Sequence, residues 1–318
     1  MKVRLMKLLR LAPENTKFGF MRFRRVSYPF SAFMSIISVV LFLTVGVNFG
    51  IDFSGGTKIE LRAKSGTADV ADLRATAQKL GLGDVEVQAS GNASDVALRF
   101  GVQAGGDAAQ GVALSKVKQA LENAYDFRSV DAVGPRVSGE LVQSGTLGIV
   151  ISIIAVLAYL WFLFEWQFAV GAIIATMHDL LLTVGFFAIT RLEFNTTSIA
   201  AILTIVGYSL NETVVVLDRI REMLRKYRRM PTDQLIDMSV NAVLPRTIMT
   251  ATTVFLALLS LVIFGGEVIR SFSVAMIWGI FVATYSSVFI CSPMLIYLGL
   301  RSDNVEPPQA AKPAKAKA

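Results

Sequence analysis

Acidic and hydrogen-bonding side chains lie inside the longest apolar runs of this sequence. His178 and Asp179 are adjacent in one run, and Glu212 lies in the next, close to Tyr208 and Asn211. Residues three or four apart share a helix face, so in a helical run Tyr208, Asn211 and Glu212 are expected on one broad polar stripe. A carboxylate in hydrocarbon costs about 2.5–3.5 kcal/mol on insertion scales, so each is expected to be paired or to face a wet cavity. Such groups are typical of ion and proton pathways.

The depth of these groups predicts a pair. In helical runs, Asp179 lies about 16 Å from the outer end of its run and Glu212 about 22 Å from the outer end of its own. Arg246, near the start of the following run, lies about 27 Å from its outer end, about one turn from the level of Glu212. We therefore expect Glu212 to pair with Arg246. A carboxylate that alternates between an Arg and a proton can act as a relay.

Structural explanations of the same residues stay open. His178 and Asp179 could form a packed polar pair that only holds helices together. Arg246 stands at a helix end, where a basic side chain often only anchors the membrane interface. The sequence by itself does not choose between these readings and a relay.

Composition points to a membrane protein without its own catalytic centre. The chain has 318 residues, of which 53% are hydrophobic and 17% charged, and its mean hydropathy is +0.56. A soluble protein would carry about a quarter charged residues. One Cys, Cys291, and one His exclude an internal disulfide or a multi-histidine metal site. No nucleophile–base pair can be assembled, so we expect neither an enzyme nor a cofactor.

Six apolar stretches are long enough to cross about 30 Å of hydrocarbon. They cover residues 29–49, 144–163, 168–190, 196–217, 243–264 and 268–300. The first lacks a small-residue cleavage site and is expected to be an uncleaved anchor. Pro293 is expected to kink or end the last.

Basic residues predict the orientation. They gather in segment 1–28, in the predicted loop 218–242 and in the tail 301–318, which an even number of spans places on one side. The positive-inside rule makes that side cytoplasmic and sends residues 50–142 outward. Nucleic-acid binding is the alternative reading of basic runs, but each run here flanks a span. The tail, rich in Ala, Lys and Pro, is expected to be disordered, and residues 143–300 to form the remaining bundle.

The outward segment has the pattern of a small α+β domain. Strand patterns at 58–63, 85–88, 96–100 and 127–133 alternate with helix patterns at 70–80 and 112–124. The order β-α-β-β-α-β predicts a ferredoxin-like domain. No glycine-rich phosphate loop precedes either helix.

The exit of the first span carries Asp52, Phe53, Gly55 and Gly56. Paired glycines permit a tight turn with positive φ. Asp52 is expected to cap or orient the chain where it enters the domain, so a structural junction is the favoured reading.

Several motifs together resemble the SecF family. They are Gly50-Ile51-Asp52-Phe53-Ser54-Gly55-Gly56, the run from Val133 to Leu141, His178-Asp179, and Gly207 to Val215 continuing through Asp218-Arg219-Ile220-Arg221-Glu222. The resemblance covers about residues 25–300, and the glycine turn is shared with SecD.

The resemblance implies a relative of the RND transporters. It implies a complex with SecD, association with the SecYEG channel, and use of the proton-motive force on a preprotein after the ATP-driven step of SecA, in the bacterial inner membrane. It places the family's membrane carboxylate on Glu212 and its membrane Arg on Arg246. Many members have Asp where Glu212 stands, so the geometry of pairing and the coupling ion, H⁺ or Na⁺, stay open.

The sequence leaves two other functions open. A non-conducting scaffold would stabilise SecD and the channel. A small-molecule efflux pump of the RND type would need a second half, since its usual chain has twelve spans.

Overall fold

The computed structural model describes residues 16–89 and 92–300, so the tail 301–318 and the first part of segment 1–28 lie outside the described residues. Six helices of the described part are long and apolar enough to cross a membrane, which confirms the predicted number of spans. They are α1 (Arg24–Thr44) after the short 3₁₀ turn η1 (Phe20–Phe23), α5 (Pro135–Leu163), α6 (Trp166–Thr190), α7 (Thr196–Lys226), α8 (Thr232–Phe264) and α9 (Glu267–Ser286), the last continued by the π-helix η2 (Ser287–Cys291) and by α10 (Ser292–Tyr297).

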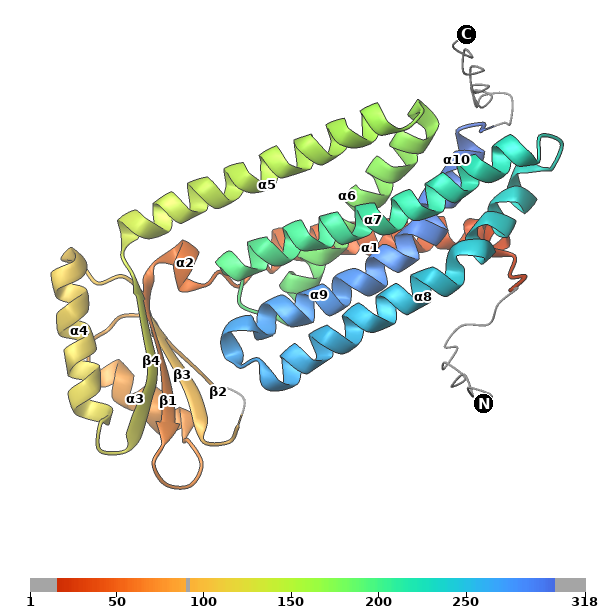
Figure 1. The fold of residues 1–318 in the computed structure, drawn as a ribbon. Helices are drawn as coiled ribbons and strands as arrows, with labels where there is room; N and C mark the ends of the chain where they lie inside the picture. Colours follow the sequence, from red (N-terminus) through yellow and green to blue (C-terminus); the bar gives the residue numbers. More distant parts are fainter. Residues whose placement is uncertain (1–15, 90–91, 301–318) are drawn as a thin grey trace, which may run out of the picture.

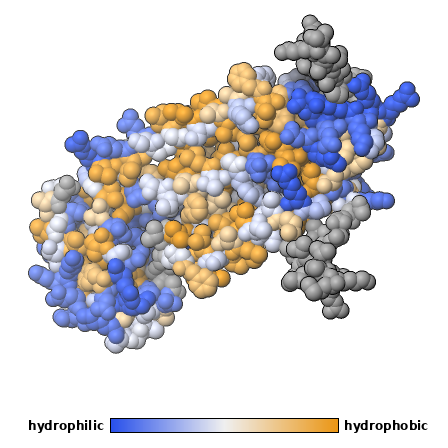
Figure 2. Space-filling view, viewed as in Figure 1, coloured by the Kyte–Doolittle hydropathy of each residue, from blue (hydrophilic) through white to orange (hydrophobic). Residues whose placement is uncertain are grey.

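The helices run side by side in a bundle, and the sheet domain lies at one end of it (Figure 1). We call this the domain end. On the face shown in Figure 2, apolar surface predominates over the middle of the bundle, and hydrophilic surface predominates on the sheet domain and at the opposite end. Exposed large apolar side chains of the long helices suit the hydrocarbon layer of a bilayer. The chain is a multi-pass membrane protein.

The predicted loop 218–242 is wrong in its conformation, because most of it is helical. Helix α7 continues to Lys226 and α8 begins at Thr232. Ile220 and Leu224, four residues apart on α7, are buried in one cluster with Leu235 and Ile236 of α8. This apolar contact stabilises both helices beyond the hydrocarbon.

Pro293 does not end the last span. The π-helix η2 precedes it, and α10 continues to Tyr297. A proline lacks the N–H that would bond the carbonyl four residues earlier, here that of Phe289. Ser27 of α1 donates to this carbonyl at 3.1 Å, and Tyr28 donates to the next, Ile290 O, at 2.8 Å. Hydrogen bonds from α1 therefore satisfy the carbonyls that the irregular turn leaves free.

Between α1 and α5 the order of strands and helices is the predicted one, although α5 begins at Pro135, within the range 50–142 expected for the domain. After the short helix α2 (Ile51–Ser54) come β1 (Gly56–Ala63), α3 (Val70–Lys79), β2 (Val85–Ala89), β3 (Asp95–Phe100), α4 (Gly106–Leu121) and β4 (Tyr125–Val133). The strands form an antiparallel sheet in the order β2-β3-β1-β4, which is the ferredoxin-like arrangement.

Alternation along the strands decides which face the helices cover. Ile59 and Leu61 of β1 are buried with Leu73 of α3 and Val117 of α4. Side chains of successive strand residues point to opposite faces, so charged residues such as Lys58 occupy the other face. Helix α4 starts six residues before the predicted position, because its first turns lack the large apolar residues that the helical pattern needs.

Candidate functional site

Helix α7 carries a polar layer between two apolar clusters. Toward the domain end, Ala201 and Ile205 belong to one cluster, and toward the opposite end Val216 and Leu217 belong to another. The side chains of Ser209, Glu212 and Thr213 are buried between them. Because α7 packs against α6, α8 and α9, these polar groups face protein and not lipid.

Asp179 joins three helices at this layer. It is 1% exposed. Its Oδ2 accepts hydrogen bonds from Ser209 of α7 at 2.5 Å and from Ser286 of α9 at 2.7 Å. Its Oδ1 lies 3.0 Å from His178 Nδ1. Sequence reasoning found the His178–Asp179 dipeptide but missed both serines, whose only signal was a small polar residue in an apolar run.

Glu212 is the second buried carboxylate of the layer, at 3% exposure. Its Oε1 accepts a hydrogen bond from Thr247 Oγ1 of α8. The predicted pair with Arg246 is not formed: no ion pair joins Glu212 to Arg246 within the described ranges, and Arg246 is exposed. Successive side chains on a helix point about 100° apart. Thr247, the residue after Arg246, therefore directs its hydroxyl at Glu212, whereas the Arg246 guanidinium points elsewhere.

Arg246 belongs to an exposed polar stripe, which we call the α7–α8 stripe. On α7 it holds Ala200, Thr204, Gly207 and Asn211, and on α8 Arg246, Thr250 and Thr253. The threonine hydroxyls bond to carbonyls of their own helices. No hydrogen bond or ion pair connects the side chains of Asn211 and Arg246 to another residue that the structure describes. A Cβ added to Gly207 would meet no atom within 4 Å.

Several buried polar atoms near the layer have no hydrogen-bond partner among the described residues. They are Tyr208 OH, His178 Nε2, and the hydroxyls of Thr213 and Thr284. Native proteins satisfy almost all buried polar atoms. Each of these atoms therefore has an unused donor or acceptor inside the bundle.

The junction residues lie at the domain end of α7. Gly55 and Gly56 have φ of +70° and +116°, as predicted, and a Cβ on Gly56 would collide with Phe100 O. Asp52 Oδ2 accepts hydrogen bonds from the backbone N and the hydroxyl of Thr196, at 2.8 and 2.7 Å. Asp52 therefore bonds to the start of α7, and its side chain does not cap the short helix α2 through which the chain enters the domain.

Phe53 completes the junction. Its ring lies 5.7 Å from that of Phe194, and Phe194 contacts Phe49 edge-on at 5.9 Å. Asp52 and Phe53 therefore contact the loop between α6 and α7 and the start of α7, whereas Gly55 and Gly56 lie against the sheet domain.

The fold and this site define an integral membrane protein with six spans, an α+β domain inserted between the first two, and a buried carboxylate layer in its bundle. The family profile described as "Protein export membrane protein SecD/SecF, C-terminal" matches residues 113–301, and "SecD/SecF GG Motif" matches residues 40–67. The second match contains the junction.

Curated relatives share most of the chain. Protein translocase subunit SecF of Rickettsia bellii is 45% identical over 90% of this chain and 95% of its own. SecF of Rhodobacter capsulatus is 44% identical over 92% of each. Protein translocase subunit SecDF of Brucella abortus is 42% identical over 92% of this chain but 39% of its own. The chain belongs to the SecF family of protein translocase subunits.

A solved structure agrees in fold. The crystal structure of SecDF from Thermus thermophilus, a translocon-associated membrane protein, has a TM-score of 0.80 and 30% identity. The match covers 90% of this chain and 39% of that one. The chain thus corresponds to about two fifths of the fused SecDF chains.

Proposed function

We propose that this chain, together with SecD, uses the proton-motive force to complete the translocation of preproteins through SecYEG after the ATP-driven step of SecA. The observation that carries the proposal is the placement of Glu212 and Ser209, the partner of Asp179, less than one turn apart on α7. A proton that reaches either carboxylate changes a contact between α7 and a neighbouring helix.

The available energy suits a cyclic device. One elementary charge that moves through 100 mV releases about 2.3 kcal/mol. This biases two arrangements of a helix bundle but does not move a long polypeptide in one step. Repeated protonation of the layer is therefore part of the proposal, and His178, Tyr208 and Asn211 are its candidate accessory groups.

The α7–α8 stripe supports SecD as the direct partner. Asn211 and Arg246 are polar side chains exposed at membrane depth, and hydrocarbon is a poor solvent for both. Interfaces between membrane helices use small and polar residues of this kind. In fused relatives the SecD part belongs to the same chain. We assign the stripe to the SecD interface, where Arg246 can meet a carboxylate of either subunit.

Basic residues at the end of the bundle opposite the domain indicate the orientation that we propose. The basic tip of the α7–α8 hairpin, with exposed Arg225, Lys226 and Arg229, is assigned to the cytoplasmic side with both termini. The α+β domain then lies outside the inner membrane, where it meets the emerging preprotein. We propose no catalytic reaction, cofactor or nucleic-acid partner for the chain.

The test is export into inverted membrane vesicles at saturating ATP, with the proton gradient intact or collapsed by an uncoupler. Glu212→Gln should abolish most of the gradient-dependent part and leave the ATP-dependent part and SecD co-purification unchanged. Glu222→Gln, an exposed position on the same helix, is the matched control. Normal gradient-dependent export by Glu212→Gln refutes the relay. A loss that tracks reduced SecD binding identifies a scaffold instead.

A further inference from the structure

The domain and the bundle meet at a compact crossing of two loops. Phe194 N donates to Asn48 O at 2.7 Å, and Gly50 N donates to Phe194 O at 2.8 Å, so residues 48–50 pair with the α6–α7 loop as a short parallel bridge. The loop leads directly into α7, and residues 48–50 lead directly into the domain. Backbone hydrogen bonds thus fix the two entrances to each other.

Polar side chains reinforce this crossing from both sides. Asp52 accepts two hydrogen bonds at Thr196, the first residue of α7, where the helix dipole favours a negative charge. Lys58 Nζ of β1 lies 2.8 Å from Glu193 Oε2 in the α6–α7 loop. Both side chains are about a quarter exposed, at 25% and 23%. One contact therefore ties the domain's entry helix to α7, and the other ties its sheet to the loop.

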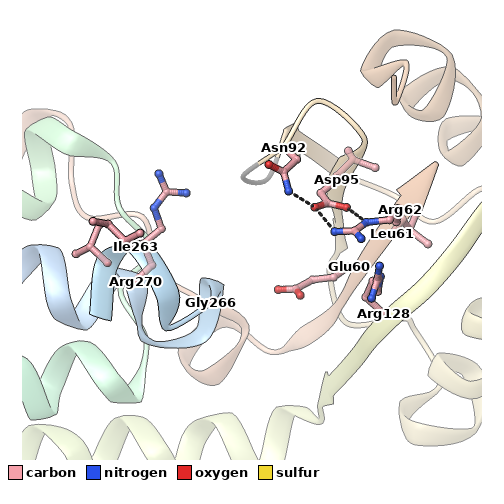
Figure 3. A pocket seen from close by; sticks show the side chains of 11 residues that line it. Glu60, Leu61, Arg62, Asn92, Asp95, Arg128, Ile263, Gly266 and Arg270 are labelled. Carbon is pink, nitrogen blue, oxygen red and sulfur yellow. Dashed lines mark hydrogen bonds and ion pairs between the residues drawn. The ribbon is translucent and has the colours of Figure 1, made fainter. Parts of the chain in front are cut away.

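Away from this crossing, a cleft lies between the sheet and the turn that joins α8 to α9. A cleft of about 500 Å³ separates Glu60, Arg62 and Arg128 of the domain from Ile263, Gly266 and Arg270 at the turn between α8 and α9 (Figure 3). The domain is thus held at α7 and also, through the packing of α2 on α5, at the start of α5. A domain held along one side with this cleft along another has the geometry of a hinge.

The lever is α7 itself. It is one uninterrupted helix from Thr196 to Lys226, and about 20 Å separates Thr196 from Ser209 along its axis. Because a continuous helix is a rigid element, a displacement of α7 at the carboxylate layer would also move Thr196.

We propose that the crossing is the joint through which α7 moves the α+β domain, with Asp52, Lys58 and Glu193 as the positioning residues that transmit the displacement. This inference rests on the proposed proton-driven function and names the contacts that convert it into domain movement. Gly55 and Gly56, directly after α2, form the close-packed turn with positive φ that connects the joint to the sheet.

The first experiment reverses the charges of one contact. Lys58→Glu and Glu193→Lys should each reduce gradient-dependent export about two- to fivefold, the range that one partly exposed ion pair commands. The double variant restores the pair with reversed polarity and should recover most of the activity. Lys64→Glu is the matched control, because Lys64 contacts Glu122 O and the Asp126 carboxylate, both of which belong to the domain.

The second experiment concerns the cap. Asp52→Asn keeps an acceptor oxygen for Thr196 and should retain most gradient-dependent export, whereas Asp52→Ala should lose it. ATP-dependent export and SecD co-purification should be normal in all variants, which a merely unfolded domain would not allow. The inference is overturned if the charge-swapped double variant is no better than the singles, or if all variants export normally while Glu212→Gln fails. Failure of the proposed function itself appears separately, as normal export by Glu212→Gln.

Discussion

Thr247, the residue after Arg246 on α8, donates a hydrogen bond from its hydroxyl to the buried carboxylate of Glu212. The carboxylate is therefore held inside a single chain by a neutral group, while the neighbouring guanidinium stays on the exposed α7–α8 stripe. Among the described residues, Glu212 forms no ion pair.

Thr247→Val should destabilise the bundle and impair gradient-dependent export. Valine has nearly the same shape but leaves a buried carboxylate without its donor, which costs about 1–3 kcal/mol or more for a charged group. Thr247→Ser keeps the hydroxyl and should stay close to the parent protein. Thermal unfolding in detergent measures the effect, and Thr253→Val, on the exposed stripe, is the control. Equal behaviour of the Val and Ser variants at 247 would contradict the bond's importance.

Ser209→Ala and Ser286→Ala should each reduce stability by about 0.6 kcal/mol, the average for interhelical hydrogen bonds in membranes. Both hydroxyls donate to the same oxygen of Asp179, so their contributions are coupled. The double variant should lose more than the sum, since that oxygen then has no donor. Unfolding in mixed micelles titrated with dodecyl sulfate gives the free energies, with the exposed Ser260→Ala as reference. Strict additivity would argue against a shared acceptor.

Gly56→Ala should loosen the sheet. The backbone at Gly56 has φ of +116°, and the new methyl would collide with Phe100 O of β3, so strain and steric overlap act together. Gly111→Ala, in the interior of α4 with no atom near the added carbon, should instead be neutral or stabilise by up to about 1 kcal/mol. Hydrogen exchange of β1 and β3 amides in the intact protein distinguishes them. Equal protection in both variants would count against the collision.

The domain should lose stability in acid through Asp95. Arg62 bonds its carboxylate at 2.5 and 2.8 Å, and these hydrogen bonds hold the pKa of Asp95 below its usual range. A lowered native pKa contributes stability above the unfolded value of about 3.9, and this contribution disappears as the pH falls through the native pKa.

Asp95→Asn should therefore flatten the pH dependence of amide protection in β1 and β3 below about pH 4. High salt should weaken the effect in the parent protein, because the pair is partly exposed. The control is Asp84→Asn, since Asp84 lies in the loop before β2. An unchanged acid profile in Asp95→Asn would contradict the assignment.

Much of the architecture followed from the sequence for simple reasons. A stretch of about twenty apolar residues has one stable arrangement in lipid, so the number of spans could be read directly. Alternation at Ile59 and Leu61 and helical spacing at Leu73 and Ala77 decided the elements of the α+β domain. Positive φ at Gly55 and Gly56 followed from the paired glycines. The basic run after residue 218 was misread as a loop, because its buried apolar residues have their partners on α8.

Only the tertiary structure decided which side chains meet. Depth along the helix axes placed Glu212 near the level of Arg246 on α8. The packing of α7, α8 and α9 sets the rotation of α8 about its own axis, and this rotation brings Thr247, not Arg246, to the carboxylate. The same holds for Asp179, whose partners Ser209 and Ser286 come from helices 30 and 107 residues away. Spacing along the sequence determines the axial position of a residue and the helix face on which it lies. The rotation of one helix relative to another is determined only when the helices pack.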